Sequence, residues 1–298
     1  MRFQKTGRVE DRLWYLGREE SGVYILEGRE NAILINGGMS YILADVLEQM
    51  KTFAIDMEKI GKILILHSHF DHVGIVPYFK RTYPKIEVYA SAPAWKIFAM
   101  PKAIEVMNSY SRLSAKQVGD ENVLKSYDLS WRDDITGSTL AEGDKIELGG
   151  VTLSILNTPG HSNCSITAYE PDMKVLFASD AIGVPYKNAC FPSMNTNITQ
   201  FFESLEKMKA LPVYSLCADH YGYITGDEAA RFTELTIEEG HKWKIMMEDL
   251  YRRHGGDIEL AAKAITDFLF QQMPDYFVAR DIMEGVFRQM FKFIAKNQ

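Results

Sequence analysis

Short apolar runs alternate with glycines and charged residues in the first part of the chain, a pattern typical of β-strands joined by tight turns. Three such runs, at residues 13–16, 23–26 and 32–35, are separated by glycine-containing segments. They read as antiparallel strands. A segment with helical spacing of apolar residues follows at about 41–53, and a fourth apolar run occupies 62–66.

The middle of the chain continues with strand-like runs and one irregular stretch. We expect a helix over 73–81, with Asp71 at its start, where free backbone N–H groups favour a carboxylate. The stretch from about 95 to 131 looks helical but is polar and interrupted, which predicts a helical insertion. Alternating patterns at 145–156 and 165–178 predict two hairpins.

Apolar residues recur at helical spacing in the last part of the chain. We therefore expect one domain over residues 1–226 and a C-terminal helical extension over 227–298 that caps the site. Most methionine and phenylalanine residues of the extension should pack in its core, because apolar stripes on helices normally face their own domain. The remaining ones would line a pocket.

Composition and charge narrow the function classes. The 298 residues are 46% hydrophobic, enough for a substantial core. A net charge of −7 without a block of Lys or Arg argues against a nucleic-acid partner. Three cysteines without CxxC spacing fit a reducing compartment. Because no run is long and apolar enough for a signal sequence or a membrane span, we expect a cytoplasmic protein with no membrane partner.

Potential metal ligands are most concentrated in the six residues HSHFDH, which directly follow the apolar run at 62–66. They place His67, His69, Asp71 and His72 within a few residues of one another. A solvated charged loop is the alternative, but the apolar run behind these residues requires burial, and buried groups of this kind need a compensating cation. The cluster therefore predicts a metal site.

Three further residues of ligand type follow strand-like runs, namely His161, Asp180 and His220. A single histidine such as His161 is usually just a hydrogen-bonded residue, so no one of them is decisive. What indicates a shared site is that all three follow a strand-like run. In a layered α/β protein the strand ends share an edge, where residues distant in sequence converge.

This set resembles the pattern of the metallo-β-lactamase superfamily, HxHxDH followed by a later His, a later Asp and a last His. The likeness runs from about Val23 to Gly226. It implies an α/β fold, a four-layer αββα sandwich with the helical insertion and the C-terminal helical extension. In layout the chain is most similar to the quinolone-signal response thioesterases of this superfamily, and it also resembles the glyoxalase II branch.

The resemblance implies two divalent metal ions. The ligands implied for the first ion are His67, His69 and His161. Those implied for the second ion are Asp71, His72 and His220, with Asp180 bridging the two. Histidine and carboxylate ligands without a thiolate suit zinc or iron, with manganese a further candidate.

Two such ions, about 3.5–4 Å apart, would supply hydroxide near neutral pH and stabilise an oxyanion. We therefore expect a hydrolase in which a metal-bridging hydroxide attacks an ester or thioester of a small molecule. Asp71 and Asp180 would keep the ion pair oriented. Tyr221 or Tyr223 would place a phenol at the oxyanion or leaving group, and we name Tyr223, although ordinary aromatic packing is an equally open interpretation.

Other functions fit the same residues. Phosphodiesters or lactones are alternative substrates, and a metal-binding regulatory protein with weak hydrolase activity is a second class. A flavodiiron oxygen reductase is disfavoured, because that family carries an acidic residue at the position of His69 and needs an attached flavin domain. The oligomeric state is open.

Overall fold

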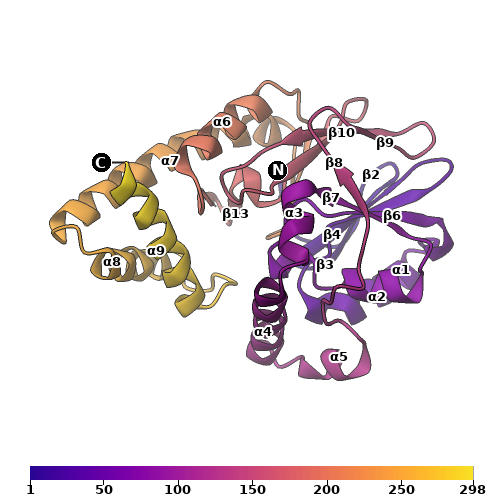
Figure 1. Cartoon of the computed structure of the whole chain (residues 1–298). Helices are drawn as coiled ribbons and strands as arrows, with labels where there is room; N and C mark the ends of the chain where they lie inside the picture. Colours follow the sequence, from indigo (N-terminus) through magenta and orange to yellow (C-terminus); the bar gives the residue numbers. More distant parts are fainter. Residues whose placement is uncertain (298) are drawn as a thin grey trace. The chain divides into compact units, whose positions relative to one another are not determined.

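The computed structural model describes residues 1–297, which run from a strand-rich part into a helical part (Figure 1). The chain divides into two compact units. The first comprises residues 1–157, 164–179 and 212–230, and the second comprises 158–163, 180–211 and the chain from 231 onward. The domain boundary expected after residue 226 stays a prediction.

The first sheet of the first unit follows the order of the chain from β2 to β8. Its strands are β2 (Gly7–Glu10), β3 (Leu13–Arg18), β4 (Ser21–Glu27), β5 (Ala32–Ile35), β6 (Ile60–Leu64), β7 (Glu87–Ser91) and β8 (Ser138–Leu140). The strands from β2 to β5 pair antiparallel, as the sequence predicts, and those from β5 to β8 pair parallel.

The second sheet of the first unit has the order β1-β16-β15-β12-β11-β10-β9. Its strands are β1 (Arg2–Phe3), β9 (Lys145–Glu147), β10 (Thr152–Asn157), β11 (Ile166–Glu170), β12 (Val175–Phe177), β15 (Ser215–Cys217) and β16 (Tyr223–Thr225). The β9–β10 and β11–β12 pairs are antiparallel, so both predicted hairpins are confirmed.

Both sheets contribute to one apolar core. The rings of Tyr24 from β4 and Phe177 from β12 meet edge to face with their centroids 5.9 Å apart. Leu64 and Leu153 belong to the same cluster and are fully buried. Truncating an aromatic ring here should cost about 3–5 kcal/mol, because the rigid surroundings cannot close the cavity. The core fixes the strand ends from which the ligand candidates emerge.

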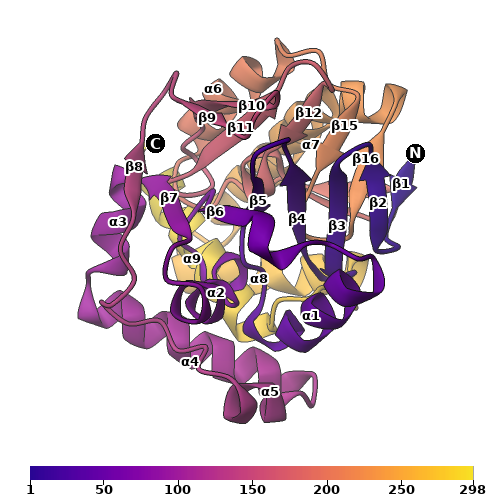
Figure 2. The same cartoon turned by 90° about the vertical axis from the view of Figure 1, so that its right-hand side faces the viewer.

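Residues 43–126 of the first unit contain five α-helices. They are α1 (Leu43–Thr52), α2 (Val76–Thr82), α3 (Ala92–Phe98), α4 (Pro101–Gln117) and α5 (Glu121–Ser126). Helix α1 packs on β3 and α3 on β7 (Figure 2). The expected insertion is thus helical, and α4 also contacts the 3-10 turn Phe70–His72. Two sheets with flanking helices and C-terminal helices confirm the predicted α/β sandwich class.

The helix expected from residue 73 begins three residues later, at Val76. Asp71 therefore lies in a separate 3-10 turn and not at the start of that helix. The helix begins late because Gly74 and Ile75 donate their N–H groups to the carbonyls of Gly38 and Gly37, in a loop distant in sequence, at 2.8 and 2.9 Å. A side chain at Gly74 would meet the Ser40 nitrogen at 2.2 Å, so this contact depends on glycine.

The second unit holds the hairpin β13 (Val184–Tyr186) and β14 (Ala189–Phe191) and the helices α6 (Ile198–Lys209), α7 (Asp227–Arg253, from residue 231 onward), α8 (Ile258–Gln272) and α9 (Arg280–Lys296). The Trp243 ring lies parallel to that of Phe287 and edge-on to that of Phe191, with centroids 6.1 and 5.1 Å apart. Met247 and Met290 are buried beside other apolar residues, which agrees with the core role expected for most of these side chains.

Within residues 1–297, none of the helices has both the length and the apolar character needed to span a bilayer. The side chains of Cys164, Cys190 and Cys217 are buried and form no disulfide in this part of the chain.

Candidate metal centre

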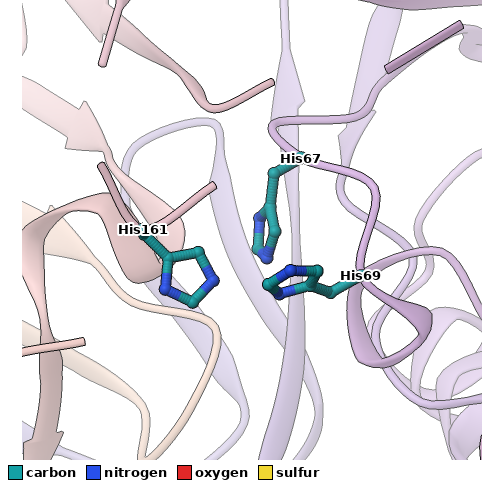
Figure 3. Close-up of side chains that lie close together, drawn as sticks. All are labelled: His67, His69 and His161. Atoms are coloured by element: carbon teal, nitrogen blue, oxygen red, sulfur yellow. The ribbon is translucent and has the colours of Figure 1, made fainter. Parts of the chain in front are cut away.

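The HSHFDH segment follows β6 after two intervening residues and contains the 3-10 turn Phe70–His72. Leu66 donates its N–H to the side-chain oxygen of Asn36 at 2.8 Å, which ties the start of the segment to the end of β5. The rings of His67 and His69 lie 4.7 Å apart at 80° to each other (Figure 3). His67 and His72 are at most 1% exposed. The segment thus holds imidazoles inside the first unit.

Asp71, His72 and His220 meet in the first unit, where their ligand atoms all lie within 4.8 Å of one another. His220 comes from the loop between β15 and β16. The Nε2 atoms of His72 and His220 are 3.2 Å apart. An Asp71 carboxylate oxygen lies 3.5 Å from the first of these nitrogens and 3.7 Å from the second. Three potential ligand atoms therefore face a common point.

The hydrogen bonds made by Nδ1 of His72 and His220 show which nitrogen of each ring carries the proton. Nδ1 of His72 lies 2.8 Å from the Asp219 carboxylate, and Nδ1 of His220 lies 2.7 Å from the Glu20 carbonyl. Carboxylate and carbonyl oxygens only accept hydrogen bonds, so both Nδ1 atoms donate and both Nε2 atoms present a lone pair. Two lone pairs and a carboxylate at close range require a cation, and this donor set fits a divalent metal ion.

Hydrogen bonds from the β3–β4 turn and from β4 fix the loop that carries His220. The Glu20 carbonyl binds the His220 ring, and the N–H of Tyr221 donates to the Glu19 carbonyl at 2.6 Å. The Tyr24 hydroxyl donates to the Ala218 carbonyl at 2.6 Å. Burial raises the pKa of Tyr24 well above its ordinary value, so this phenol stays a donor. The loop position is therefore set by another part of the first unit.

Asp219 was missed as a site residue by the sequence analysis. Its side chain is 2% exposed, and one carboxylate oxygen accepts from His72, Asn36 and Ser179. The only signal in the sequence is that Asp219, like Asp180, ends an apolar strand-like run. Glu20 leaves no signal of this kind, because it acts through its backbone carbonyl.

The second unit brings together His161 and Asp180, the two remaining predicted ligands. His161 (Figure 3) is 2% exposed, and its Nδ1 donates to the Ser193 carbonyl at 2.9 Å. Its Nε2 lies 3.5 Å from an Asp180 carboxylate oxygen. The Ser193 hydroxyl donates to the Asp180 backbone carbonyl at 2.6 Å. As in the first unit, a lone-pair nitrogen faces a carboxylate oxygen, an arrangement that a cation would satisfy.

Gly160 sets the turn before His161. Its φ of +133° and the backbone of Phe201 at 2.3 Å from the position of a Cβ exclude a side chain there. The Pro-Gly break that the sequence shows before this histidine is therefore a real constraint on the loop.

Tyr223, predicted as catalytic, has a packing role in the structure. It lies in β16 within the core between the sheets, stacked on Phe3 at 5.1 Å and edge-on to Tyr15 at 5.8 Å. Burial raises the pKa of the Tyr223 phenol. We therefore assign it no catalytic role, and the packing interpretation left open by the sequence is the one its contacts favour.

Residues 16–220 match the family model described as the metallo-beta-lactamase superfamily. A metallo-beta-lactamase fold-containing protein of Sulfurisphaera tokodaii is 23% identical over 214 residues, which cover 70% of this chain and 75% of that protein. A hydroxyacylglutathione hydrolase of Aliivibrio fischeri is 31% identical over 165 residues, or 53% of this chain and 47% of the enzyme. The aligned part thus spans about half of that hydrolase.

A solved structure shows the same fold over most of the chain. A metallo-beta-lactamase family protein from Thermus thermophilus aligns with a TM-score of 0.67 and 17% identity, covering 97% of this chain and 95% of that protein. At this identity the likeness concerns the fold alone.

Proposed function

This chain belongs to the metallo-beta-lactamase superfamily of metal-dependent hydrolases, and we propose that it hydrolyses an ester or thioester of a small molecule at a two-metal site. The observation that carries the proposal is the convergence of the His72 and His220 Nε2 lone pairs, 3.2 Å apart, beside the Asp71 carboxylate. These atoms lie in one unit and are close enough together to bind a single metal ion.

We assign the ligands of the two ions as the family pattern orders them. Asp71, His72 and His220 would hold one ion, and His67, His69 and His161 the other, with Asp180 shared. Within the second unit, the 3.5 Å between Nε2 of His161 and an Asp180 carboxylate oxygen supports this assignment. Zinc or iron suits these donors, with manganese a further candidate.

A bound pair of divalent ions supplies hydroxide near neutral pH and a Lewis acid for the developing oxyanion. The side chains of this protein would bind the two ions and orient the ligand rings. Asp219 and the Glu20 carbonyl hold the protons of His72 and His220 on Nδ1, so that both Nε2 atoms stay available as ligands. Asp71 and Asp180 contribute the negative charge that balances the cations.

The choice of ester or thioester rests on the relatives. Several matching proteins are hydroxyacylglutathione hydrolases, whose named substrate is an acyl thioester. The chain covers less than half of these enzymes, so their substrate is not transferred to it. What we carry over is the bond type, because the matched region is the one that holds the ligand candidates.

Metal analysis combined with a paired substrate assay tests the proposal. We expect close to two metal ions per chain after loading with zinc or iron, and faster hydrolysis of an acyl thioester than of a nitrophenyl phosphodiester. Asp180→Ala should abolish turnover while the far-UV circular dichroism spectrum is kept. Fewer than one ion per chain after loading would contradict the two-metal site, and a preference for the phosphodiester or a lactone would reassign the substrate.

A further inference from the structure

We infer that Asp219 is the positioning residue for His72, and that its carboxylate sets the metal affinity of the Asp71, His72 and His220 site. The inference rests on the proposed function, because it assumes that His72 binds a metal ion. It adds a residue that is outside the HxHxDH pattern and outside the ligand set given above.

The first observation is the crowding of donors on one oxygen of Asp219. This oxygen lies 2.8 Å from Nδ1 of His72 and 2.6 Å from the amide nitrogen of Asn36, and it accepts a short hydrogen bond from the Ser179 hydroxyl. A buried carboxylate oxygen that accepts several hydrogen bonds is fixed in position by its donors. The acceptor for the His72 ring is therefore held in place at Nδ1.

The donors are themselves fixed in place. Asn36 accepts the N–H of Leu66 on its side-chain oxygen at 2.8 Å, which directs its amide nitrogen to Asp219. Asn36 and Ser179 both have a positive φ, of 59° and 48°. Such conformations cost about 1–3 kcal/mol and persist only where the surroundings enforce them. The backbone carbonyl of Asp219 also accepts from Gly22 at 2.7 Å, so the whole residue is anchored.

The consequence for His72 is orientational and electronic. The bond to Asp219 fixes the Nδ1–H tautomer and the ring plane, and it leaves Nε2 facing His220 and Asp71. A carboxylate partner also raises the basicity of the imidazole as a ligand. Ser179 extends the network to a second histidine, since its hydroxyl lies 3.3 Å from Nδ1 of His67.

A purely structural role for Asp219 makes a different prediction. In that case Asp219→Asn would lower the stability of the metal-free protein and leave metal affinity unchanged once the protein is folded. If Asp219 acts through His72, the amide keeps an acceptor for the ring but loses the charge, and affinity falls. The two roles are therefore separated by metal affinity measured on folded protein.

The experiment compares wild type, Asp219→Asn and the control Glu170→Gln by competition between each apoprotein and a zinc chelator. Glu170 is also a buried carboxylate of the first unit, but its side chain accepts the Met173 N–H at 2.6 Å and lies in β11. We expect Asp219→Asn to weaken binding of the ion at the Asp71, His72 and His220 site about 10- to 100-fold, the range typical of partners of metal-ligating histidines. Glu170→Gln should bind as wild type does.

Cobalt substitution gives a second readout, because the visible absorption of bound Co²⁺ reports the geometry of its ligands. We expect the spectrum of Asp219→Asn to change and that of Glu170→Gln to match wild type. If Asp219→Asn does not fold, Ser179→Ala removes one donor from the same oxygen and should weaken binding by up to about tenfold.

Unchanged zinc affinity together with an unchanged cobalt spectrum in the folded variant would overturn the inference and leave the proposed function standing. A wild-type protein that binds none of zinc, iron and cobalt would overturn both. The failures of the two proposals are therefore distinguishable in one set of measurements.

Discussion

His72 and His220 face each other through nitrogens that both carry lone pairs, 3.2 Å apart, while their opposite nitrogens donate to Asp219 and to the Glu20 carbonyl. While both rings are neutral, neither Nε2 can donate to the other unless a ring changes its tautomer and breaks one of these bonds. The pair therefore needs a cation between the two nitrogens, and the stability of the fold should depend on it.

Removal of metal should lower the melting temperature. An ion present at about 1,000 times its dissociation constant stabilises the folded state by about 4 kcal/mol. For a domain of this size that corresponds to a difference on the order of ten degrees. Thermal unfolding with excess zinc and with EDTA, followed by circular dichroism, measures the difference. Equal melting temperatures under the two conditions would show that zinc does not stabilise the folded protein.

Gly222→Ala should be far more destabilising than Gly119→Ala. Gly222 has a φ of +87°, and a Cβ there would lie 1.8 Å from the Phe3 carbonyl oxygen. Gly119 has a similar φ of +79° but open space around it, so it isolates the conformational cost of about 1–2 kcal/mol. We expect Gly222→Ala to cost at least about 3 kcal/mol by urea titration. Equal losses would mean that the loop moves away from β1 freely.

Tyr223→Phe should keep both stability and turnover. The ring contacts with Phe3 and Tyr15 are preserved in phenylalanine, and we assign the hydroxyl no role in the reaction. We expect kcat within about twofold and a change in unfolding free energy within about 0.5 kcal/mol. Loss of kcat with an unchanged melting temperature would restore the catalytic role predicted from the sequence.

Asp134→Asn should lower stability at neutral pH but not in acid. Hydrogen bonds from the Arg81 guanidinium, both at 2.8 Å, hold the pKa of the Asp134 carboxyl below its ordinary value. Because the folded-state pKa is lowered, the contribution is complete above about pH 4 and is lost as the pH falls through the folded-state pKa. The side chain is 44% exposed.

Such exposure limits the effect of Asp134 to about 0.5 kcal/mol, or one to two degrees in melting temperature. Melting temperatures of wild type and variant should therefore converge between pH 7 and pH 3. A difference that stays constant over this range would show that the ion pair does not act through the charge of Asp134.

The sequence predicts the strands well, because alternation and glycine-bounded apolar runs reflect burial between two sheets. It also indicates that His72 and His220 approach each other, since both follow strands whose ends share an edge. It does not reveal that Asp71 precedes the helix by a separate turn. That turn depends on hydrogen bonds between Gly74 and the distant loop at Gly38, which leave no periodic pattern.

The supporting atoms of the site are harder to find from sequence. A backbone carbonyl such as that of Glu20 has no residue-type signature, so its bond to His220 is invisible before the fold is known. Asp219 differs in this respect, because a carboxylate at the end of an apolar run is the same signal that drew attention to Asp180. The sequence pattern nevertheless singles out its neighbour His220, because a histidine is the more common metal ligand.

The bond between the Glu20 carbonyl and the His220 ring joins residues 200 positions apart. A ribosome adding roughly 5–20 residues per second would expose the HSHFDH segment on the order of ten seconds before His220 emerges. The β3–β4 turn, 200 positions before His220, would be exposed for longer still before this histidine emerges. Capture of an ion by the proposed ligands Asp71, His72 and His220 would therefore be a late step of biogenesis, and a nascent chain halted before residue 220 would carry an incomplete centre.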